Sequence, residues 1–346
     1  MAHHGLDRKI MPEKEQNRVV ALVTGASGFT GSVLCQALKR KGYHIKALIR
    51  PTSDVQNLKK LDVELIEGDL AAPLTLMGKM KGVDRVFHIA ALYRQEGVPR
   101  EMFFKVNVEG TRALLEESCS SGVKRFIHCS TVGVQGEIKN PPATESTPYN
   151  PGDHYQESKM EGERLALGYF QNHKLDCVVV RPVGIYGPGD TRFLKLFKFI
   201  YNGKFRMIGN GHVLYHLTYV EDLVKGIILA GEIPGASGKI YTLGGNEYVE
   251  LHELVKIIAS ILGKPVPTRH VPLWPVKVAA FFCEKICRPL GIEPPIYPRR
   301  LDFFSKDRAF DISKAQQELG YQPEISLREG LTRTAQWYLE KGLLKK

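Results

Sequence analysis

The chain has 346 residues, and its 48 Lys and Arg against 37 Asp and Glu give a net charge of +11 at pH 7. This length is enough for a large α/β core with a smaller second lobe. The basic excess favours anionic partners, but the sequence has no basic block interleaved with aromatic residues and no known nucleic-acid motif, so we expect no nucleic-acid partner. It has no CxxC pair, no signal peptide and no run of about 18 apolar residues, which favours a cytoplasmic protein with reduced cysteines.

Residues 1–17 are polar and lack periodicity, so we expect a flexible tail. The apolar run Val19–Thr24 then predicts a short strand. The segment Gly25-Ala26-Ser27-Gly28-Phe29-Thr30-Gly31 follows at once, and a helical pattern begins near Gly31. Strand, glycine turn and helix in this order form a pyrophosphate cradle, because the glycines permit a tight turn and the helix N-terminus presents N–H groups to an anion. A plain glycine-rich loop is the alternative.

The first half of the chain alternates short apolar strands with helical segments, which is typical of a doubly wound parallel sheet covered on both faces. The helical patterns include Glu101–Ser121 and Tyr155–His173. In such a sheet, ligands bind beyond the carboxyl ends of the strands. The further expected strands are Tyr43–Ile49, Val63–Ile66, Asp84–Ala90, Arg125–Ser130 and Leu175–Val180.

The alternation ends after Arg181-Pro182, where stretches dense in proline and glycine indicate a second lobe. Two capping boxes, Ser313–Gln316 and Ser326–Glu329, predict helices near the end of the chain. The expected domains are a dinucleotide-binding domain over 18–185, to which 212–243 returns, and a smaller C-terminal substrate-binding lobe over 186–211 and 244–346.

A tyrosine and a lysine with i,i+4 spacing, Tyr155 and Lys159, lie on one face of the expected helix. A tyrosine is a poor base near neutral pH, because its ordinary pKa is about 10. A nearby ammonium group and a positive nicotinamide ring favour the phenolate, so that the tyrosine can exchange a proton with a substrate oxygen. Ser130-Thr131 end the strand before this helix, and a hydroxyl there can stabilise the reacting oxygen. A surface helix with a chance pair is the alternative.

Segments along almost the whole chain match the motifs of one enzyme family. They are Thr24–Gly31, Gly68-Asp69-Leu70, His88–Ala91, Val106–Thr111, Ser130-Thr131, Tyr155 with Lys159, and Arg181–Asp190. On these residues the chain resembles the extended short-chain dehydrogenases/reductases, the family that also holds nucleotide-sugar epimerases and dehydratases. The resemblance implies a Rossmann fold and a nicotinamide dinucleotide cofactor.

The same resemblance implies roles for single residues. Thr131, Tyr155 and Lys159 would be the catalytic triad, Asn107 a structural and proton-relay partner, and Asp69 a contact of the adenine. Thr30 departs from the family, in which an aliphatic residue is commoner at this position. We expect this difference to alter helix packing more than activity. The other implied cofactor contacts are Gly25, Ser27, Gly28, Phe29, Thr30, Gly31, Leu70, Ala90 and Pro182, together with Tyr155 and Lys159.

The end of the second strand bears on the cofactor. An acidic residue about 20 residues beyond the glycines binds the ribose 2′-hydroxyl of NAD. Here the strand Tyr43–Ile49 ends in Arg50, which suits a 2′-phosphate by charge and bidentate geometry. We therefore expect NADP to be favoured over NAD, while Asp54 lies close enough to leave NAD open.

Three reactions of the family compete. By the resemblance, a dehydratase carries an acid pair directly after its catalytic Ser or Thr, where this chain has Val132-Gly133. Epimerases commonly have an asparagine at the position of Gly184, where the amide helps to hold the diphosphate. Arg181–Asp190 and Phe310–Ala315 instead resemble 3β-hydroxysteroid dehydrogenases, sterol 4-carboxylate 3-dehydrogenases (decarboxylating) and hopanoid-associated relatives.

The favoured reading is therefore an oxidoreductase that interconverts a secondary alcohol and a ketone on a 3β-hydroxysteroid-like or sterol-like substrate. A 4-carboxysterol with coupled decarboxylation is one form of this reading. A nucleotide-sugar 4-epimerase is the alternative. A non-catalytic NADP-binding sensor is a weaker one, since such relatives lack the tyrosine or lysine that this chain keeps.

An apolar helix candidate at 274–287, near basic residues, supports an apolar substrate. It would line an apolar pocket or contact a membrane peripherally, with the basic side chains on lipid phosphates. Ordinary packing of the lobe is the alternative, and the segment is too short to cross a bilayer. The basic residues concerned are Lys285, Arg288, Arg299 and Arg300.

The remaining expectations concern single residues and assembly. Arg94 and Arg192 lie in loops that would face the substrate, and His88 is expected to pack near the cofactor. His212 and His216 have no metal partners at suitable spacing, so we expect no metal site. A homodimer is usual in the family, here through the expected helices Glu101–Ser121 and Tyr155–His173.

Overall fold

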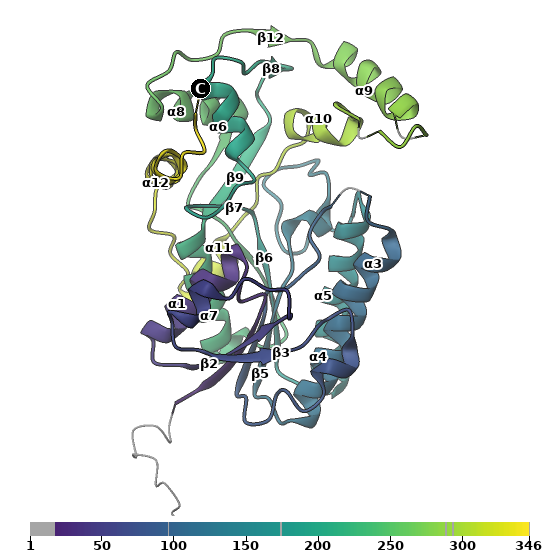
Figure 1. Ribbon diagram of the computed structural model, residues 1–346, viewed down its shortest axis with the longest axis vertical. Helices are drawn as coiled ribbons and strands as arrows, with labels where there is room; N and C mark the ends of the chain where they lie inside the picture. The colour runs from purple at the N-terminus through teal and green to yellow at the C-terminus, as the bar shows by residue number, and fades with distance from the viewer. Residues whose placement is uncertain (1–17, 96, 174, 288, 293, 346) are drawn as a thin grey trace, which may run out of the picture.

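The computed structural model describes residues 18–95, 97–173, 175–287, 289–292 and 294–345. The expected tail at 1–17 and Arg288 lie outside the described residues. A seven-stranded parallel sheet forms the centre of the fold (Figure 1), in the order β10-β6-β5-β4-β1-β2-β3. This confirms the expected doubly wound parallel sheet of Rossmann type. The strands are β1 (Val20–Thr24), β2 (His44–Ile49), β3 (Glu64–Glu67), β4 (Arg85–His88), β5 (Arg125–Cys129), β6 (Cys177–Pro182) and β10 (Ile240–Leu243).

Helices cover both faces of this sheet, which explains why its strands are apolar without alternation. In β1, Ala21 and Val23 pack into one core with Leu34 of the first helix, whereas Leu22 packs into a second core with Leu114 on the opposite face. Figure 1 shows α1, α7 and α11 on one face and α3, α4 and α5 on the other. Their bounds are α1 (Phe29–Arg40), α3 (Arg100–Phe104), α4 (Gly110–Ser120), α5 (His154–His173), α7 (Val220–Glu232) and α11 (Ser313–Leu319).

The helix expected at Glu101–Ser121 is interrupted by a π-helical turn, η2 (Lys105–Glu109), between α3 and α4. Such turns insert an extra residue into a helix and occur frequently at functional sites. Gly110 follows the turn at a close approach, since a Cβ on it would lie 2.7 Å from Cβ of Leu70. The turn contains Asn107, which is buried.

A separate hydrophobic core, distinct from the two on the faces of the large sheet, lies beyond the carboxyl edge of that sheet. This part of the molecule is uppermost in Figure 1 and is called the upper lobe here. Two small sheets belong to it, of order β11-β9-β7 and β12-β8. Its helices are α6 (Leu194–Tyr201), α8 (Leu251–Ile261), α9 (Leu273–Cys287), α10 (Pro298–Ser305) and α12 (Leu327–Glu340). Its strands are β7 (Gly184–Tyr186), β8 (Met207–Ile208), β9 (Leu214–Tyr219), β11 (Tyr248–Glu250) and β12 (His270–Val271).

Of the two expected capping boxes, one is correct. Oγ of Ser326 accepts a hydrogen bond from the backbone N–H of Glu329 and caps α12. The other is wrong, because Ile312 is the N-cap of α11 and Ser313 is already helical. There the carboxylate of Asp311 accepts from the N–H of Ser313 instead. The remaining short elements are α2 (Gln56–Lys59), η1 (Pro73–Leu76), η3 (Val132–Gln135) and η4 (Pro234–Ala236).

Candidate active site

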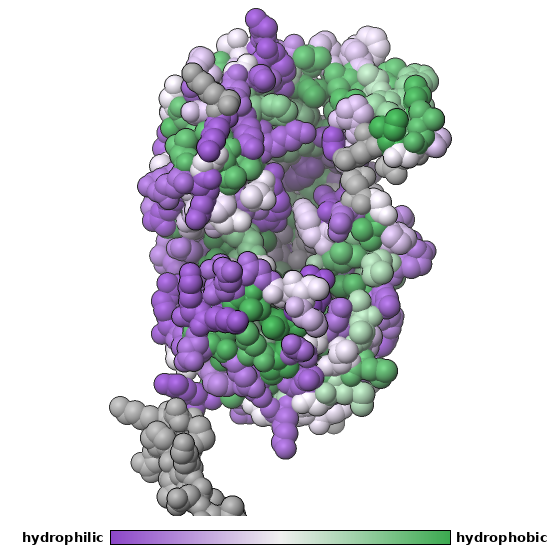
Figure 2. Space-filling view, in the orientation of Figure 1, coloured by the Kyte–Doolittle hydropathy of each residue, from purple (hydrophilic) through white to green (hydrophobic). Residues whose placement is uncertain are grey.

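A cleft of about 1470 Å³ separates the carboxyl edge of the large sheet from the upper lobe, and Figure 2 shows the surface hollowed there. The fold brings most of the expected site residues together in its wall. Those that line it are Gly25, Gly28, Phe29, Thr30, Gly31, Ala90, Thr131, Tyr155, Lys159 and Pro182. Those that lie outside its lining are Ser27, Arg50, Asp69, Leu70 and Asn107.

The turn from β1 into α1 has glycine at two positions, Gly25 and Gly31, where no room is left for a Cβ. Gly25 has φ +68°, and a Cβ on it would lie 2.9 Å from the backbone of Ala90. A Cβ on Gly31 would lie 2.0 Å from the carbonyl oxygen of Gly25. Gly28 is the N-cap of α1 and lines the cleft, so the first N–H groups of the helix lie at the cleft wall. This cradle fits the pyrophosphate of a dinucleotide.

The expected contacts for the other end of a dinucleotide lie at the carboxyl ends of β2 and β3. Arg50 follows β2 and is exposed. Asp69 follows β3, and its Oδ1 accepts a hydrogen bond from the N–H of Ala71. Leu70 is buried, and it lies directly against Gly110. Because β2 and β3 follow β1 in the sheet, a ligand that runs outward from the glycine turn reaches these residues.

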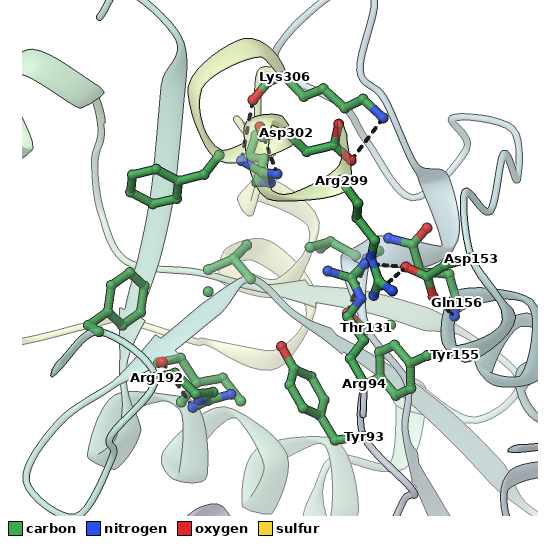
Figure 3. Close-up of a pocket in the computed structure, with 18 of the residues that line it drawn as sticks. Tyr93, Arg94, Thr131, Asp153, Tyr155, Gln156, Arg192, Arg299, Asp302 and Lys306 are labelled. Carbon is green, nitrogen blue, oxygen red and sulfur yellow. Dashed lines mark hydrogen bonds and ion pairs between the residues drawn. The ribbon is translucent and has the colours of Figure 1, made fainter. Parts of the chain in front are cut away.

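Tyr155 and Lys159 lie on the first turns of α5 (Figure 3 labels Tyr155) and are 9% and 2% exposed. Burial lowers the pKa of Lys159 to about 8. Burial also raises the pKa of Tyr155, so in the protein by itself the phenol keeps its proton. The phenolate expected from the sequence takes no account of this cost of burial. Of the neighbouring charged side chains, Arg94 lowers the pKa of Tyr155, whereas Asp153 raises it.

Thr131 begins the short turn η3 directly after β5. Its Oγ1 accepts a hydrogen bond of 3.1 Å from the N–H of Gly133, which leaves the hydroxyl hydrogen free to be donated into the cleft. The neighbouring Ser130 also lines the cleft, and its buried Oγ has no hydrogen-bond partner among the described residues. A ligand oxygen in the cleft can therefore receive a hydrogen bond from the end of β5.

Asn107 connects three parts of the site from behind the cleft. Its Oδ1 accepts from the N–H of Leu92 at 2.7 Å, and its Nδ2 donates to the carbonyl of Leu92 at 3.1 Å. Nδ2 also donates to Oγ of Ser158 at 2.9 Å, and Ser158 donates to the carbonyl of Tyr155 at 2.8 Å. The side chain therefore fixes the loop after β4 relative to the first turn of α5.

His88, at the end of β4, is fully buried in a directed chain of hydrogen bonds. Oγ1 of Thr111 donates to the carbonyl of Asn107 at 2.7 Å, so it accepts from Nε2 of His88 at 2.9 Å. Oγ1 of Thr24 accepts from the N–H of Ala90 and therefore donates to Nδ1 of His88. These partners require the neutral imidazole with its proton on Nε2, and burial lowers the pKa of His88 to about 3.

A residue that the sequence argument missed is Gly162, on α5 one turn beyond Lys159. A Cβ on Gly162 would lie 2.8 Å from the carbonyl oxygen of Asn107, so only glycine lets α5 approach the π-helical turn this closely. The signal that could have revealed it is a helix-disfavouring glycine on the same face as the catalytic pair.

The expected substrate-facing arginines both line the cleft, and both are already paired; Figure 3 shows Arg94 beside Asp153. Nη2 of Arg94 lies 2.9 Å from Oδ2 of Asp153, and its guanidinium lies 5.7 Å from the ring centre of Tyr155. Arg299 of α10 contacts the same oxygen at 3.1 Å. Arg192 pairs with Asp190 at 2.6 Å. Two guanidinium groups on one carboxylate leave this side of the cleft positive.

The rest of the wall in the upper lobe combines aromatic and basic side chains. It was missed from the sequence because its members come from many separate segments. The aromatic ones are Phe199, Tyr215, Phe303, Phe304 and Phe310. The basic ones are Lys195, Lys204, Arg206, Arg300, Lys306 and Arg308. This wall suits a ligand with both an apolar body and an anionic group.

Gly184, on β7, faces this cleft in tight surroundings. A Cβ on Gly184 would lie 2.6 Å from the methyl carbon Cδ2 of Leu217 on β9. A larger side chain there would require Leu217 to move.

Comparisons with known proteins show the family of the chain. The model of the NAD dependent epimerase/dehydratase family matches residues 21–244. Over 331 residues the chain is 31% identical to the sterol-4-alpha-carboxylate 3-dehydrogenase, decarboxylating, of Mus musculus, a match that covers 91% of this chain and 89% of that protein. It is 29% identical over 335 residues to a 3-beta-hydroxysteroid dehydrogenase of Mycolicibacterium neoaurum, with 92% and 91% covered.

Among solved structures, the UDP-glucuronic acid 4-epimerase of Bacillus cereus in complex with NAD is similar with a TM-score of 0.75 at 27% identity, over 94% of this chain and 100% of that one. The epimerase fold therefore extends over the cleft and both of its walls. The chain belongs to the NAD-dependent epimerase/dehydratase family, the extended short-chain dehydrogenases/reductases, and is an enzyme of that type.

Proposed function

We propose that the protein interconverts a secondary alcohol and a ketone on a steroid-like or sterol-like substrate. The observation that carries this proposal is Gly184, which stands where, by the resemblance, epimerases commonly have the asparagine that helps to hold the diphosphate; the side chain of Leu217 packs against this glycine. The aromatic wall of the upper lobe supports an apolar substrate body.

The proposed catalytic residues are Thr131, Tyr155 and Lys159, with Asn107 as the residue that positions them. A bound nicotinamide supplies the hydride chemistry. Tyr155 exchanges the proton of the substrate oxygen, Thr131 donates a hydrogen bond to that oxygen, and the charge of Lys159 favours the phenolate. The hydrogen bonds of Asn107 keep the first turn of α5 in place while the proton moves.

The positive side of the cleft extends the proposal to a substrate that carries a carboxylate on the carbon atom next to the carbinol carbon. Arg94 and Arg299 share the single carboxylate of Asp153 and so retain charge for such a group. Once the carbinol is a ketone, that ketone accepts the electron pair of the breaking C–C bond, and carbon dioxide leaves.

For the cofactor we propose NADP rather than NAD within this NAD-binding family. Arg50 is exposed at the carboxyl end of β2, where a 2′-phosphate would receive its charge. The cofactor contacts proposed from the sequence are otherwise those of the glycine turn, with Asp69 and Leu70 after β3, Ala90 after β4 and Pro182 at the end of β6.

The test follows reduced nicotinamide by absorbance. Purified protein receives NADP or NAD with a 3β-hydroxysterol, with or without a 4-carboxylate, or with a UDP-hexose. We expect net reduction with the sterol, a loss of at least about 100-fold in Tyr155→Phe with cofactor binding retained, and near-normal turnover in the control Tyr93→Phe. An unchanged rate in Tyr155→Phe overturns the site, and binding without turnover of any substrate supports a sensor.

A nucleotide-sugar 4-epimerase is the second candidate, favoured by the basic residues of the wall. Lys204, Arg206 and Arg308 provide charge for a diphosphate from the upper lobe. In the same assay this candidate predicts interconversion of the UDP-hexose without net reduction, and no reaction of the sterol.

We also propose that α9 contacts a membrane surface carrying anionic lipids. The helix buries only Ala280 fully, and Trp274, Phe282 and Ile286 on it are 72%, 58% and 61% exposed. Figure 2 shows this apolar surface at the upper right, on the helix adjacent to α10 of the cleft wall. Within the described residues, no helix is long and apolar enough to cross a bilayer.

Sedimentation with vesicles tests the membrane proposal. We expect Phe282→Ser to reduce binding to vesicles of phosphatidylcholine with phosphatidylserine, while Leu74→Ser, which removes an apolar side chain 82% exposed elsewhere, leaves it unchanged. Equal binding of both variants, or none by the parent protein, contradicts the proposal.

The proposed homodimer uses α4 and α5, which pack on one another on one face of the sheet (Figure 1). Light scattering coupled to size-exclusion chromatography should give twice the mass of the chain, and a monomer mass at working concentration overturns this.

A further inference from the structure

Two histidines and a glutamate converge on the surface of the upper lobe, away from the residues of the cleft. Oε2 of Glu250 lies 2.7 Å from Nδ1 of His212 and 2.9 Å from Nδ1 of His252. The three ligating atoms lie within 4.8 Å of one another. The spacing of the histidines along the chain indicated no metal site, because His212 and Glu250 are 38 residues apart.

Backbone hydrogen bonds hold the three residues in place. Glu250 ends β11, which pairs antiparallel with β9, and its partner Leu214 lies two residues after His212. The N–H of His252 donates to the carbonyl of Gly211 at 3.0 Å, and the N–H of the residue before it, Leu251, donates to Val213 at 2.9 Å. The segments that carry the ligands are therefore joined on both sides of the cluster, and only side-chain torsions remain to be ordered on binding.

The donor set is one that zinc uses. Two imidazoles and a carboxylate hold catalytic zinc in several enzymes, with water in the fourth position. In a tetrahedral site with bonds of about 2.0–2.1 Å, ligand atoms are about 3.3 Å apart. The present N···O distances of 2.7 and 2.9 Å need to open by only about half an ångström. The hydrogen bond from His212 lowers the pKa of Glu250, so the carboxylate stays ionised.

We propose that Nδ1 of His212, the carboxylate of Glu250 and Nδ1 of His252 bind a divalent transition metal ion such as Zn²⁺, with solvent as the fourth ligand. The ion takes the place of the two protons that now point from Nδ1 at one oxygen, and each imidazole then carries its proton on Nε2. It joins the start of β9 to the start of α8, and β9 carries Tyr215 and His216 of the cleft wall. The proposal does not depend on the oxidoreductase activity, which uses none of these residues.

Other groups of the chain also attract zinc and need controls. Sγ atoms of Cys283 and Cys287 lie 3.9 Å apart on α9. His44 pairs with Glu64 at 3.1 Å and offers a matched histidine–carboxylate pair. The two tail histidines are removed in the parent protein by His3→Ala and His4→Ala.

The test titrates the full chain, freed of metal by a chelator, with Zn²⁺ by calorimetry and with Co²⁺ by visible absorption. We expect one equivalent to bind with a tetrahedral Co²⁺ spectrum that lacks a thiolate band, and to raise the melting temperature. Glu250→Gln and His252→Ala should each weaken binding by at least about 100-fold, since loss of an outer partner alone costs 10–100-fold. His44→Ala and the double variant Cys283→Ser/Cys287→Ser should bind like the parent.

Saturable binding of one ion that is equal in the parent and in His252→Ala overturns the proposal, as does the absence of any saturable binding. Because all three side chains are on the surface, the variants are expected to fold, which the melting temperature without metal checks.

Discussion

Glu163 and Arg181 form a two-point ion pair that is almost completely buried. Nη2 of Arg181 lies 2.5 Å from Oε1 of Glu163, Nε lies 3.1 Å from Oε2, and the side chains are 1% and 0% exposed. Tyr149 donates a further hydrogen bond to Oε1 at 2.7 Å. The pair joins α5, one turn beyond Lys159, to β6, and so fixes the helix that carries the proposed catalytic residues against the sheet.

Removing one partner of this pair should be strongly destabilising. We expect Arg181→Met to lower the free energy of unfolding by about 3–5 kcal/mol, because an unpaired carboxylate remains buried. The double variant Glu163→Leu/Arg181→Met should recover much of this loss. The control is Glu161→Gln on the same helix, whose partner Arg164 is exposed, with an expected change below about 0.5 kcal/mol. Urea unfolding measures all three variants, and equal effects of Arg181→Met and Glu161→Gln contradict this expectation.

Two glycines of α5 should respond in opposite ways to alanine. Gly162→Ala places a Cβ 2.8 Å from the carbonyl of Asn107, so α5 is pushed from the π-helical turn. We expect a loss of about 1–3 kcal/mol in stability and a fall in turnover. At Gly168 no atom lies within 4 Å of a Cβ, so Gly168→Ala should stabilise by about 0.5–1 kcal/mol. Thermal melts and turnover of both variants test this, and a stable, active Gly162→Ala refutes it.

The buried Lys159 predicts a pH dependence of stability. Its pKa is about 8 in the folded protein against 10.5 ordinarily, so between these values the unfolded chain binds more protons and the free energy of unfolding rises with pH. Below pH 8 the cost of the buried charge is fully present and corresponds to about 3 kcal/mol.

Lys159→Met removes this titration, and it also removes the charge that lowers the pKa of the buried Cys129. Its stability advantage over the parent protein should therefore shrink by about 3 kcal/mol between about pH 7 and about pH 10.5. Urea unfolding at several pH values measures the difference. A difference that is independent of pH shows that the pKa of Lys159 is not lowered.

Arg50 should decide the preference between cofactors. Hydrogen bonds to charged groups contribute about 1.5–3 kcal/mol, so Arg50→Ala should raise KM for NADP by about 10- to 100-fold and leave KM for NAD nearly unchanged. Arg40→Ala, which removes the same charge from an exposed position at the end of α1, serves as the control. Equal changes for both cofactors in Arg50→Ala contradict a 2′-phosphate contact.

The sequence predicts six of the seven strands of the large sheet, because each of these is a short apolar run with its own local signal. The seventh, β10, is expected only as part of the segment 212–243 that returns to the dinucleotide-binding domain. The π-helical turn at Lys105–Glu109 was not predictable in this way, since its residues continue an ordinary helical pattern and only the close approach of Gly110 to Leu70 reveals the constraint. Similarly, Ser313 fits a capping box locally, but Asp311 competes for the same N–H group.

For the site, the sequence indicated Tyr155, Lys159 and the glycine turn because their chemistry depends on local spacing. Local spacing does not reveal burial, which raises the pKa of Tyr155, and it does not reveal contacts between distant segments. Gly162 against Asn107, and Glu250 between two histidines, both arise only when separate elements meet.

The chain enters and leaves the upper lobe more than once. However, α9 and α10 belong to one continuous segment, which runs from the end of α8 to the β-bridge between Arg308 and Tyr215. Among its described residues, this segment contributes no strand to any sheet apart from β12, which pairs with β8 over two residues. Residues of 295–306 in this segment line the cleft, whereas the rest of the wall in the upper lobe comes mainly from 192–217. The segment can therefore change in length or sequence, and with it one part of the cleft wall, without disturbing any strand pairing of the seven-stranded sheet.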